Sequence, residues 1–159
     1  MPSANLRYLA LRQRIAGLLT KEATSPLSLA ALVRELYRGL PHYCVLGIFR
    51  VEGERLELVA SHGADAGTVA STGAGLACVA AETRATVFVT DISRDERARP
   101  VYEGIAGELA VPILQGATVV GVIDVQSDRP GALGFGDREL LQWLAEQLGP
   151  WIRAGVRNQ

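Results

Sequence analysis

Two carboxylates and an amide near the end of the chain have the residue types and spacing to bind a charged ligand. Asp124 and Gln126 lie in the apolar stretch VVGVIDVQSD, and Glu108 lies in the preceding stretch ELAVPIL. A charge in a hydrophobic strand costs several kcal/mol unless it is hydrated, paired or bound. Because side chains alternate across a strand, Asp124 and Gln126 share a face, and Glu108 is expected to point the same way.

The same pattern allows two explanations of Asp124. Perturbed carboxylates in clefts often belong to functional sites, which favours a small polar ligand bound by Glu108, Asp124 and Gln126. Alternatively, Asp124 caps a loop or pairs with an arginine such as Arg84 or Arg99. The sequence leaves both explanations open.

The stretch GAGLA at positions 73–77 supplies a second type of ligand contact. It leads into a predicted short helix, and backbone N–H groups at the start of a helix can bind an anion or a carboxylate. Gly75, Leu76 and Ala77 are therefore candidate binding residues, and Asp91 and Tyr102 are candidates for the pocket wall. An ordinary helix start without a ligand is the alternative.

Metal and disulfide chemistry has less support. Cys44 and Cys78 form neither a disulfide framework nor a CxxC pair. His42 and His62 have no partner at metal-ligand spacing. We therefore expect no metal and no resident cofactor beyond a small ligand of unknown identity.

The composition excludes other classes of protein. The 16 Lys and Arg residues against 17 Asp and Glu residues argue against a general nucleic-acid surface. Arginines interrupt the apolar residues of the first segment, so it is not a signal peptide, and no stretch approaches a membrane span. We expect no nucleic-acid or membrane partner and a cytoplasmic location.

The elements that position the candidate residues follow from hydrophobic periodicity. Helical periodicity covers most of 1–40 and returns in 136–156, where Asp137 lies in the first turn. Alternating patterns around turn signals at 52–54 and 115–117 predict two hairpins. We expect one domain over 1–159, with helices in 1–40, sheet and pocket loops in 43–128 and a final helix in 136–156. Hairpins favour an antiparallel α+β fold, with terminal helices on one face and the loop-rich middle on the other.

Two segments resemble the GAF domain family, which comprises small-molecule-sensing relatives of PAS domains. GELAVPILQGATVVGVIDVQSDRPGALGFGDRELLQWLAEQL resembles the family's strand, hairpin, strand and final helix. GAGLACVAAETRATVFVTDI resembles its Gly-rich turn, short helix, strand and Asp. The resemblance implies a GAF/PAS-like sheet with a ligand pocket under the loops. It does not specify the ligand, because the family's members bind very different molecules or none.

One enzymatic branch of the family, the free methionine-R-sulfoxide reductases, is similar in its pocket. The resemblance aligns Glu108 and Asp124 with carboxylates that would receive an ammonium group, and Gln126 replaces a second Asp. The branch needs a thiolate to attack the sulfoxide sulfur and a second thiol to resolve the product. Val101 occupies the position of the catalytic Cys, and Cys78 lies one place after the position of the other. We therefore expect no enzymatic activity.

The overall expectation is a small-molecule-sensing or signalling GAF module that acts through a dimer or a signalling protein partner. The first helix has two apolar faces, and the last carries Trp143 and Trp151, which favours a homodimer through the terminal helices. Two alternatives remain. One is a free methionine-R-sulfoxide reductase-like enzyme or its degenerate remnant, and the other is a dimerisation module without a ligand.

Overall fold

The computed structural model describes residues 4–21, 26–63, 75–100 and 103–155. The predicted positions Gly73, Ala74, Val101 and Tyr102 lie outside the described residues. The elements run in the order α1 Ala4–Lys21, α2 Pro26–Gly39, β1 Val45–Glu52, β2 Arg55–Gly63, α3 Leu76–Thr83, β3 Val87–Val89, a 3-10 turn Ile92–Arg94, β4 Gly107–Gln115, β5 Thr118–Ser127 and α4 Phe135–Gly155.

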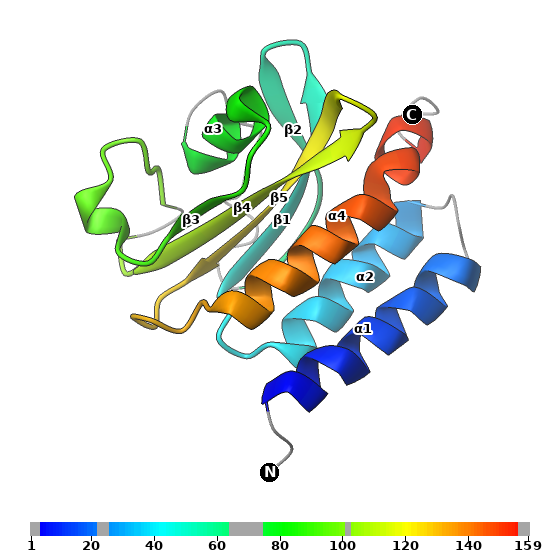
Figure 1. Ribbon diagram of the computed structural model, residues 1–159, viewed down its shortest axis with the longest axis horizontal. Coiled ribbons are helices and arrows are strands. Elements are labelled where there is room, and N and C mark those ends of the chain that lie inside the picture. The colour runs from blue at the N-terminus through cyan, green and yellow to red at the C-terminus, as the bar shows by residue number, and fades with distance from the viewer. Residues whose placement is uncertain (1–3, 22–25, 64–74, 101–102, 156–159) are drawn as a thin grey trace.

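The described strands form one antiparallel sheet in the order β2-β1-β5-β4-β3 (Figure 1). Both predicted hairpins are present, as the pairs β1–β2 and β4–β5. Gly53 and Gly116 begin their two-residue turns with φ near +62° and +63°. Glycine adopts such left-handed backbone angles without the steric cost that a Cβ adds, so these residues fix the hairpin registers. The α+β antiparallel prediction is confirmed.

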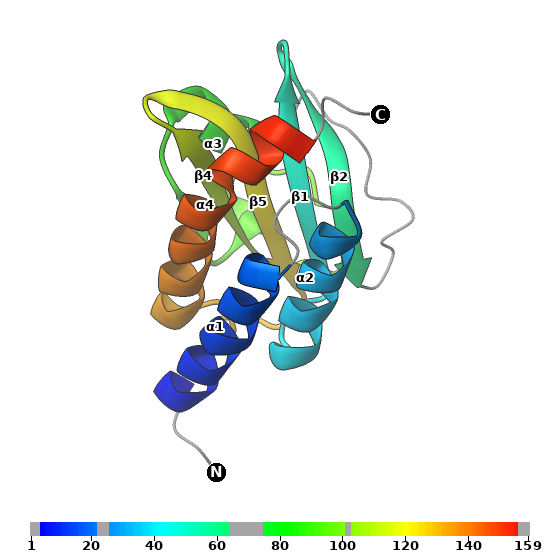
Figure 2. The ribbon, with the colours of Figure 1, turned by 90° about the vertical axis from the view of Figure 1, so that its right-hand side faces the viewer.

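Helices α1, α2 and α4 lie on one side of the sheet, and α3 lies on the other (Figures 1 and 2). Buried leucines of α2 and α4, such as Leu36 and Leu144, pack against Ile48, Ile123 and Val125 from the sheet. Burial of each such side chain stabilises the fold by about 1.5–3 kcal/mol relative to its exposure. α1 forms an outer layer on α2 and α4 (Figure 2). The terminal helices therefore cover one face, as predicted.

The opposite face of the sheet carries a smaller apolar cluster under α3. Phe49 of β1 and Val122 of β5 contact Ala77, Cys78 and other buried residues of this cluster. The residues that α3 contributes to this cluster, Ala77, Cys78 and Ala80, have small side chains. This is the face on which the sequence places the polar candidate residues.

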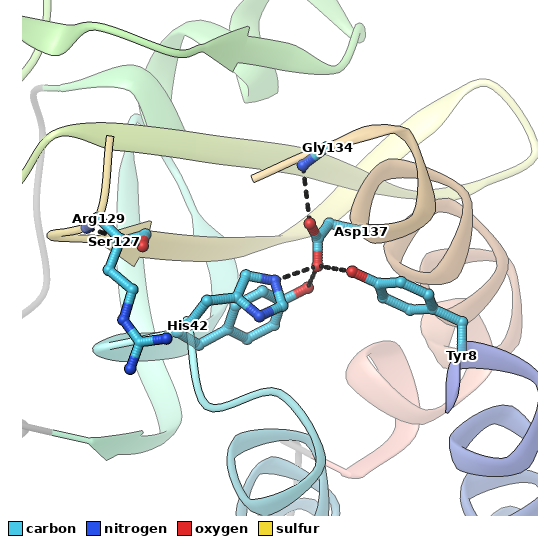
Figure 3. Close-up of polar contacts among 7 residues, drawn as sticks. Tyr8, His42, Ser127, Arg129, Gly134 and Asp137 are labelled. Atoms are coloured by element: carbon cyan, nitrogen blue, oxygen red, sulfur yellow. Dashed lines mark hydrogen bonds and ion pairs between the residues drawn. The ribbon is translucent and has the colours of Figure 1, made fainter. Parts of the chain in front are cut away.

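A buried carboxylate, Asp137, connects three parts of the helical layer (Figure 3). Its Oδ1 accepts hydrogen bonds from the Tyr8 hydroxyl at 2.9 Å, the Tyr43 hydroxyl at 2.8 Å and His42 Nε2 at 2.8 Å. Its Oδ2 accepts from the Gly134 N–H at 2.8 Å. Burial raises the pKa of Asp137, but hydrogen bonds, led by that from His42, outweigh it and leave the pKa below its usual value. The carboxylate thereby joins α1, the α2–β1 connection and the start of α4.

Candidate ligand-binding site

The β4–β5 register brings three predicted residues together on one face. Glu108 pairs across the strands with Gln126, and Ala110 pairs with Asp124. Glu108 and Asp124 are therefore diagonal neighbours, within reach of one another across the two strands. Ala110 lies in the cluster under α3, so the three polar side chains face α3 and not the terminal helices. The structure thus agrees with the alternation seen in the sequence.

All three side chains are buried. Glu108 is 3% exposed, Asp124 is 7% exposed and Gln126 is 4% exposed. Gln126 Nε2 donates to Asp124 Oδ2 at 3.3 Å. The carboxyl groups of Glu108 and Asp124 are close enough for each to shift the pKa of the other. No donor among the described residues reaches Glu108 Oε1 or Asp124 Oδ1.

Burial and mutual proximity perturb both carboxyl groups. Burial, the charge of Asp124 and the hydrogen bond to it raise the pKa of Glu108 well above its usual value. Burial also raises the pKa of Asp124, while hydrogen bonds from Glu108 and Gln126 act in the opposite direction. Two close carboxylates in a low-dielectric site do not both ionise, because the second charge is repelled by the first. The pKa of Glu108 is the more strongly raised of the two, so Glu108 is the carboxyl group that retains a proton more readily.

The arginines considered as partners of Asp124 are engaged elsewhere. Arg84 Nη1 donates to the Ala117 carbonyl at 3.4 Å. Arg99 Nη1 donates to the carbonyls of Glu96 and Ala98, at 2.8 Å each. In the part of the chain that the structure describes, no lysine or arginine forms an ion pair with either buried carboxyl group.

Small side chains surround Asp124 on the neighbouring strands. Gly47 of β1 lies directly opposite Asp124 on one side, and Ala110 of β4 lies opposite on the other. The Phe49 ring occupies the surface above Gly47, where an added Cβ would lie 3.0 Å from its Cε2. The residues directly opposite Asp124 on both neighbouring strands are therefore small, and the long side chain nearest to its carboxyl group on β4 is that of Glu108.

The start of α3 adds backbone donors to the same face. Gly75 precedes the helix with φ of 95°, and within the described residues no side chain caps it. The first intrahelical bond is Val79 N–H to the Gly75 carbonyl. The first N–H groups of an α-helix have no intrahelical acceptor, which leaves those of Leu76 and Ala77 available for an anionic group.

Asp91 does not join the site. It lies on the surface, where its Oδ1 accepts from the Ser93 N–H at 3.1 Å and the Ser93 hydroxyl at 2.6 Å. These hydrogen bonds lower the pKa of Asp91 and start the 3-10 turn. The expectation that Asp91 completes the pocket wall therefore has no geometric support, because the side chain serves as a local cap.

Sequence reasoning missed Asp95, whose charge contributes to the raised pKa of Glu108. Arg97 Nη2 lies 2.6 Å from Asp95 Oδ2, and this contact helps to lower the pKa of Asp95 to about 2. The residue lies in the charged segment SRDERARP, which has no pattern that would link it to the strand.

A separate cavity of about 700 Å³ lies between the β1–β2 turn and α3. Its walls include Leu56, Cys78, Glu82 and Arg84. No pattern in the sequence indicates this cavity, because the turn and the helix are distant along the chain. Among the described residues, no group of three or more potential metal ligands occurs here or elsewhere. No helix in the described ranges is long and apolar enough to cross a membrane.

Comparisons with known proteins identify the fold. The family model described as GAF domain matches residues 20–153. No curated protein matches the chain.

Several solved structures are similar over nearly the whole chain. A free methionine-R-sulfoxide reductase from Neisseria meningitidis, solved with its substrate, has a TM-score of 0.84 and 20% identity, covering 93% of this chain and 89% of that chain. The GAF domain of a phosphoenolpyruvate-protein phosphotransferase from Coxiella burnetii has a TM-score of 0.83 and 18% identity, covering 95% of each chain. The corresponding Acinetobacter domain has a TM-score of 0.80 and 23% identity, covering 92% of each chain. Similarity at these identities shows a shared fold.

Proposed function

The chain belongs to the GAF domain family, and from this premise we propose that it is a signalling module that binds the positive end of a small polar ligand between Glu108 and Asp124. One observation carries the proposal. Two carboxyl groups are buried side by side on the face under α3, and no described lysine or arginine pairs with them. The family's known members include ligand sensors and enzymes, so membership alone does not choose between these functions, whereas the buried carboxyl pair favours binding of a positively charged group.

An ammonium group suits the chemistry of this pair. It carries the opposite charge, and its N–H groups can donate to Glu108 Oε1 and Asp124 Oδ1 at the same time. Gln126 already donates to the other Asp124 oxygen and so holds the carboxylate in place. A buried carboxylate that gains such a partner loses much of its desolvation penalty, which makes ligand binding favourable.

The negative end of the same ligand would bind at the start of α3. Leu76 is buried with Val45, which pairs across the strands with Gln126, so the helix start lies over the end of the sheet that holds the polar group. Backbone N–H groups at a helix start favour anions through hydrogen bonding and the helix dipole. We therefore propose a small zwitterion, such as an amino acid, as the class of ligand.

A thermal-shift panel tests this proposal. Amino acids, simple amines, nitrate and nucleotides would be screened, and we expect amino-acid-like compounds to raise the melting temperature. Asp124→Asn should abolish the effect, because it removes the charge that binds the ammonium group. Glu139→Gln, on the exposed side of α4, is the control and should retain it. A panel in which no compound stabilises the wild type, or in which D124N responds equally, contradicts the proposal and favours a module without a ligand.

We propose that the chain is not itself a reductase. The sequence has Val101 where the reductase branch has its catalytic Cys, and burial raises the pKa of the Cys78 thiol. A neutral thiol is a poor nucleophile toward sulfoxide sulfur. NADPH-coupled turnover of free methionine sulfoxide with thioredoxin and its reductase tests this point, and we expect none. Turnover that is lost in Cys78→Ser would overturn it.

We propose further that output passes through a second copy of the chain at α1. Leu6 is 55% exposed and Leu9 is 53% exposed, and the two lie one turn apart on α1. Helix α1 is the outer helix of its layer (Figure 2). Trp143 and Trp151 of α4 are half-buried and pack against the core. Light scattering after size-exclusion chromatography should show a dimer that becomes a monomer in the Leu6→Glu, Leu9→Glu variant. A monomeric wild type would exclude this route and leave a different signalling protein as the partner.

A further inference from the structure

The geometry of the buried carboxyl pair favours a single proton on it when no ligand is bound. Glu108 and Asp124 are diagonal neighbours on adjacent strands and face the same side of the sheet, so two negative charges there would repel each other. Both groups are more than nine-tenths buried, which makes a second negative charge at this position costly. The pair thus has a net charge of −1 in the free protein.

The groups packed around the pair give no compensating positive charge among the described residues. β1 contributes Gly47, and β3 contributes Val89 opposite Glu108. The titratable groups that face the pair are neutral or negative. One is the thiol of Cys78 on α3, whose pKa is raised in part by the charge of Asp124. The other is the carboxylate of Asp95 after the 3-10 turn, whose charge helps to raise the pKa of Glu108.

Two arginines of the segment that precedes β4 have other partners. Arg97 forms its ion pair with Asp95, and Arg99 donates to backbone carbonyls. Because no described cation pairs with the two carboxyl groups, protonation of one of them is what keeps the charge of the pair at −1. Any positively charged group that binds between the two carboxyls must compete with that proton for the same oxygens.

We propose that a ligand's ammonium group replaces this proton, so that binding releases one proton to solvent. Before binding, Glu108 is a carboxylic acid that donates to the Asp124 carboxylate. After binding, both groups are carboxylates and each accepts an N–H of the ammonium group. One proton leaves and one monocation enters, so the charge of the pocket is unchanged. This inference rests on the proposed function and adds its pH dependence.

The exchange distinguishes ligands by their N–H groups and links affinity to pH. An alkylammonium ion can donate to both carboxylates, whereas a quaternary ammonium ion has the same charge but no N–H to replace the lost hydrogen bond. Affinity should rise up to about tenfold per pH unit while Glu108 is protonated in the free protein and the ligand's amine remains charged. Above the pKa of Glu108 this dependence should disappear, because no proton remains to be displaced.

Carbon-13 NMR of the side-chain carboxyl of Glu108 tests the exchange directly. The full chain is labelled at glutamate Cδ, and Glu108→Gln assigns the signal. We expect a protonated carboxyl at pH 7 that becomes ionised on titration with methylammonium chloride, while tetramethylammonium chloride at equal ionic strength leaves it protonated. Two results overturn the inference, namely an ionised Glu108 in the free protein or a Glu108 that stays protonated throughout the methylammonium titration.

Failure of the proton exchange and failure of ligand binding give different results. If the NMR result overturns the exchange but an amino acid still stabilises the wild type and not D124N, ligand binding stands without proton release. If nothing in the thermal-shift panel binds, the proposed function itself is wrong. In Glu108→Gln the side-chain amide replaces the acid as donor to Asp124 and cannot release a proton, so an amino acid that still binds this variant should do so with little dependence on pH between 6 and 8.

Discussion

Gly47 of β1 lies directly across from Asp124 of β5, and the Phe49 ring lies over Gly47 on the same strand. The arrangement explains why a glycine is placed in the middle of a buried strand. A Cβ at position 47 would lie 3.0 Å from the ring, closer than ordinary contacts allow. The shape of the candidate site beside Asp124 thus depends on the absence of a side chain at Gly47.

The first prediction concerns this contact. Gly47→Ala should force the Phe49 ring to shift by a few tenths of an ångström and should destabilise the fold by about 1 kcal/mol or more. Gly17→Ala in α1 is the matched control, because its added methyl group meets nothing within 4 Å. It should stabilise the fold by roughly 0.5–1 kcal/mol, since glycine is unfavourable inside a helix. Urea unfolding measures both, and equal effects of the two substitutions would contradict the argument.

The second prediction follows from the raised pKa of Glu108. The folded state retains this proton at a pH where the unfolded chain, with a Glu pKa of about 4.3, has lost it. The free energy of unfolding should therefore fall as pH rises from about 4.3 toward the raised folded pKa. Glu108→Gln mimics the protonated acid and should remove this decline, making the variant more stable than the wild type at pH 8 by about 1–3 kcal/mol. An unchanged pH profile of unfolding would show that Glu108 is not protonated in the fold.

The third prediction concerns the junction at Asp137. Asp137→Asn presents an N–H₂ group to hydroxyl, imidazole and backbone donors and should cost about 3 kcal/mol. Tyr8→Phe removes one hydrogen bond and should cost about 1 kcal/mol. Chemical denaturation at pH 7 measures both, with Glu139→Gln as the exposed control in the same helix. A cost for D137N no larger than that of Y8F would show that the junction contributes little.

The same carboxylate predicts behaviour in acid. The pKa of Asp137 is lowered in the fold, so its contribution to stability is present above the unfolded value of about 3.9. It should be lost as pH falls through the lower folded pKa. D137N should therefore flatten the acid limb of the stability profile below pH 4 while leaving the decline at higher pH, which we attribute to Glu108. If D137N lost as much unfolding free energy below pH 4 as the wild type does, other carboxylates would be responsible for that loss.

The fourth prediction concerns the Cys78 thiol. Burial, and the nearby charges of Glu82 and Asp124, raise its pKa, so little thiolate exists at pH 7. In the Cys44→Ala background, where Cys78 is the only cysteine of the chain, alkylation by iodoacetamide should be at least about tenfold slower than in urea. Mass spectrometry follows the reaction. Equal rates in the folded and unfolded states would show an exposed or activated thiol and would reopen the question of thiol chemistry.

Much of the fold was predictable because it rests on local signals. Helical and alternating periodicities, with glycines at the two turns, indicated the helices, both hairpins and the antiparallel sheet. The shared face of Glu108, Asp124 and Gln126 was also predictable, since alternation along each strand and a tight hairpin fix their register. These features depend on residues that are close in sequence.

The remaining features depend on contacts between distant segments. The sequence placed Asp137 favourably in the first turn of a helix, but it did not indicate that hydroxyls 129 and 94 positions away would share that carboxylate. Asp91 was expected in the pocket wall and instead caps the turn two residues later, because its Ser93 partner is closer than any distant site. Side-chain hydrogen bonding of this kind follows from tertiary or turn geometry, which hydrophobic patterning does not encode.

The alternation along β5 has a mechanical consequence. Asp124 faces α3, while its sequence neighbours Ile123 and Val125 belong to the core that α2 and α4 share. Only the sheet, one strand thick at β5, therefore separates the candidate site from the helical layer. Rotation of β5 about its own axis to tighten a grip on a ligand would push these two side chains against the helices on the far side. A displacement of Asp124 on one face of the sheet would therefore also displace side chains that the helical layer contacts on the other.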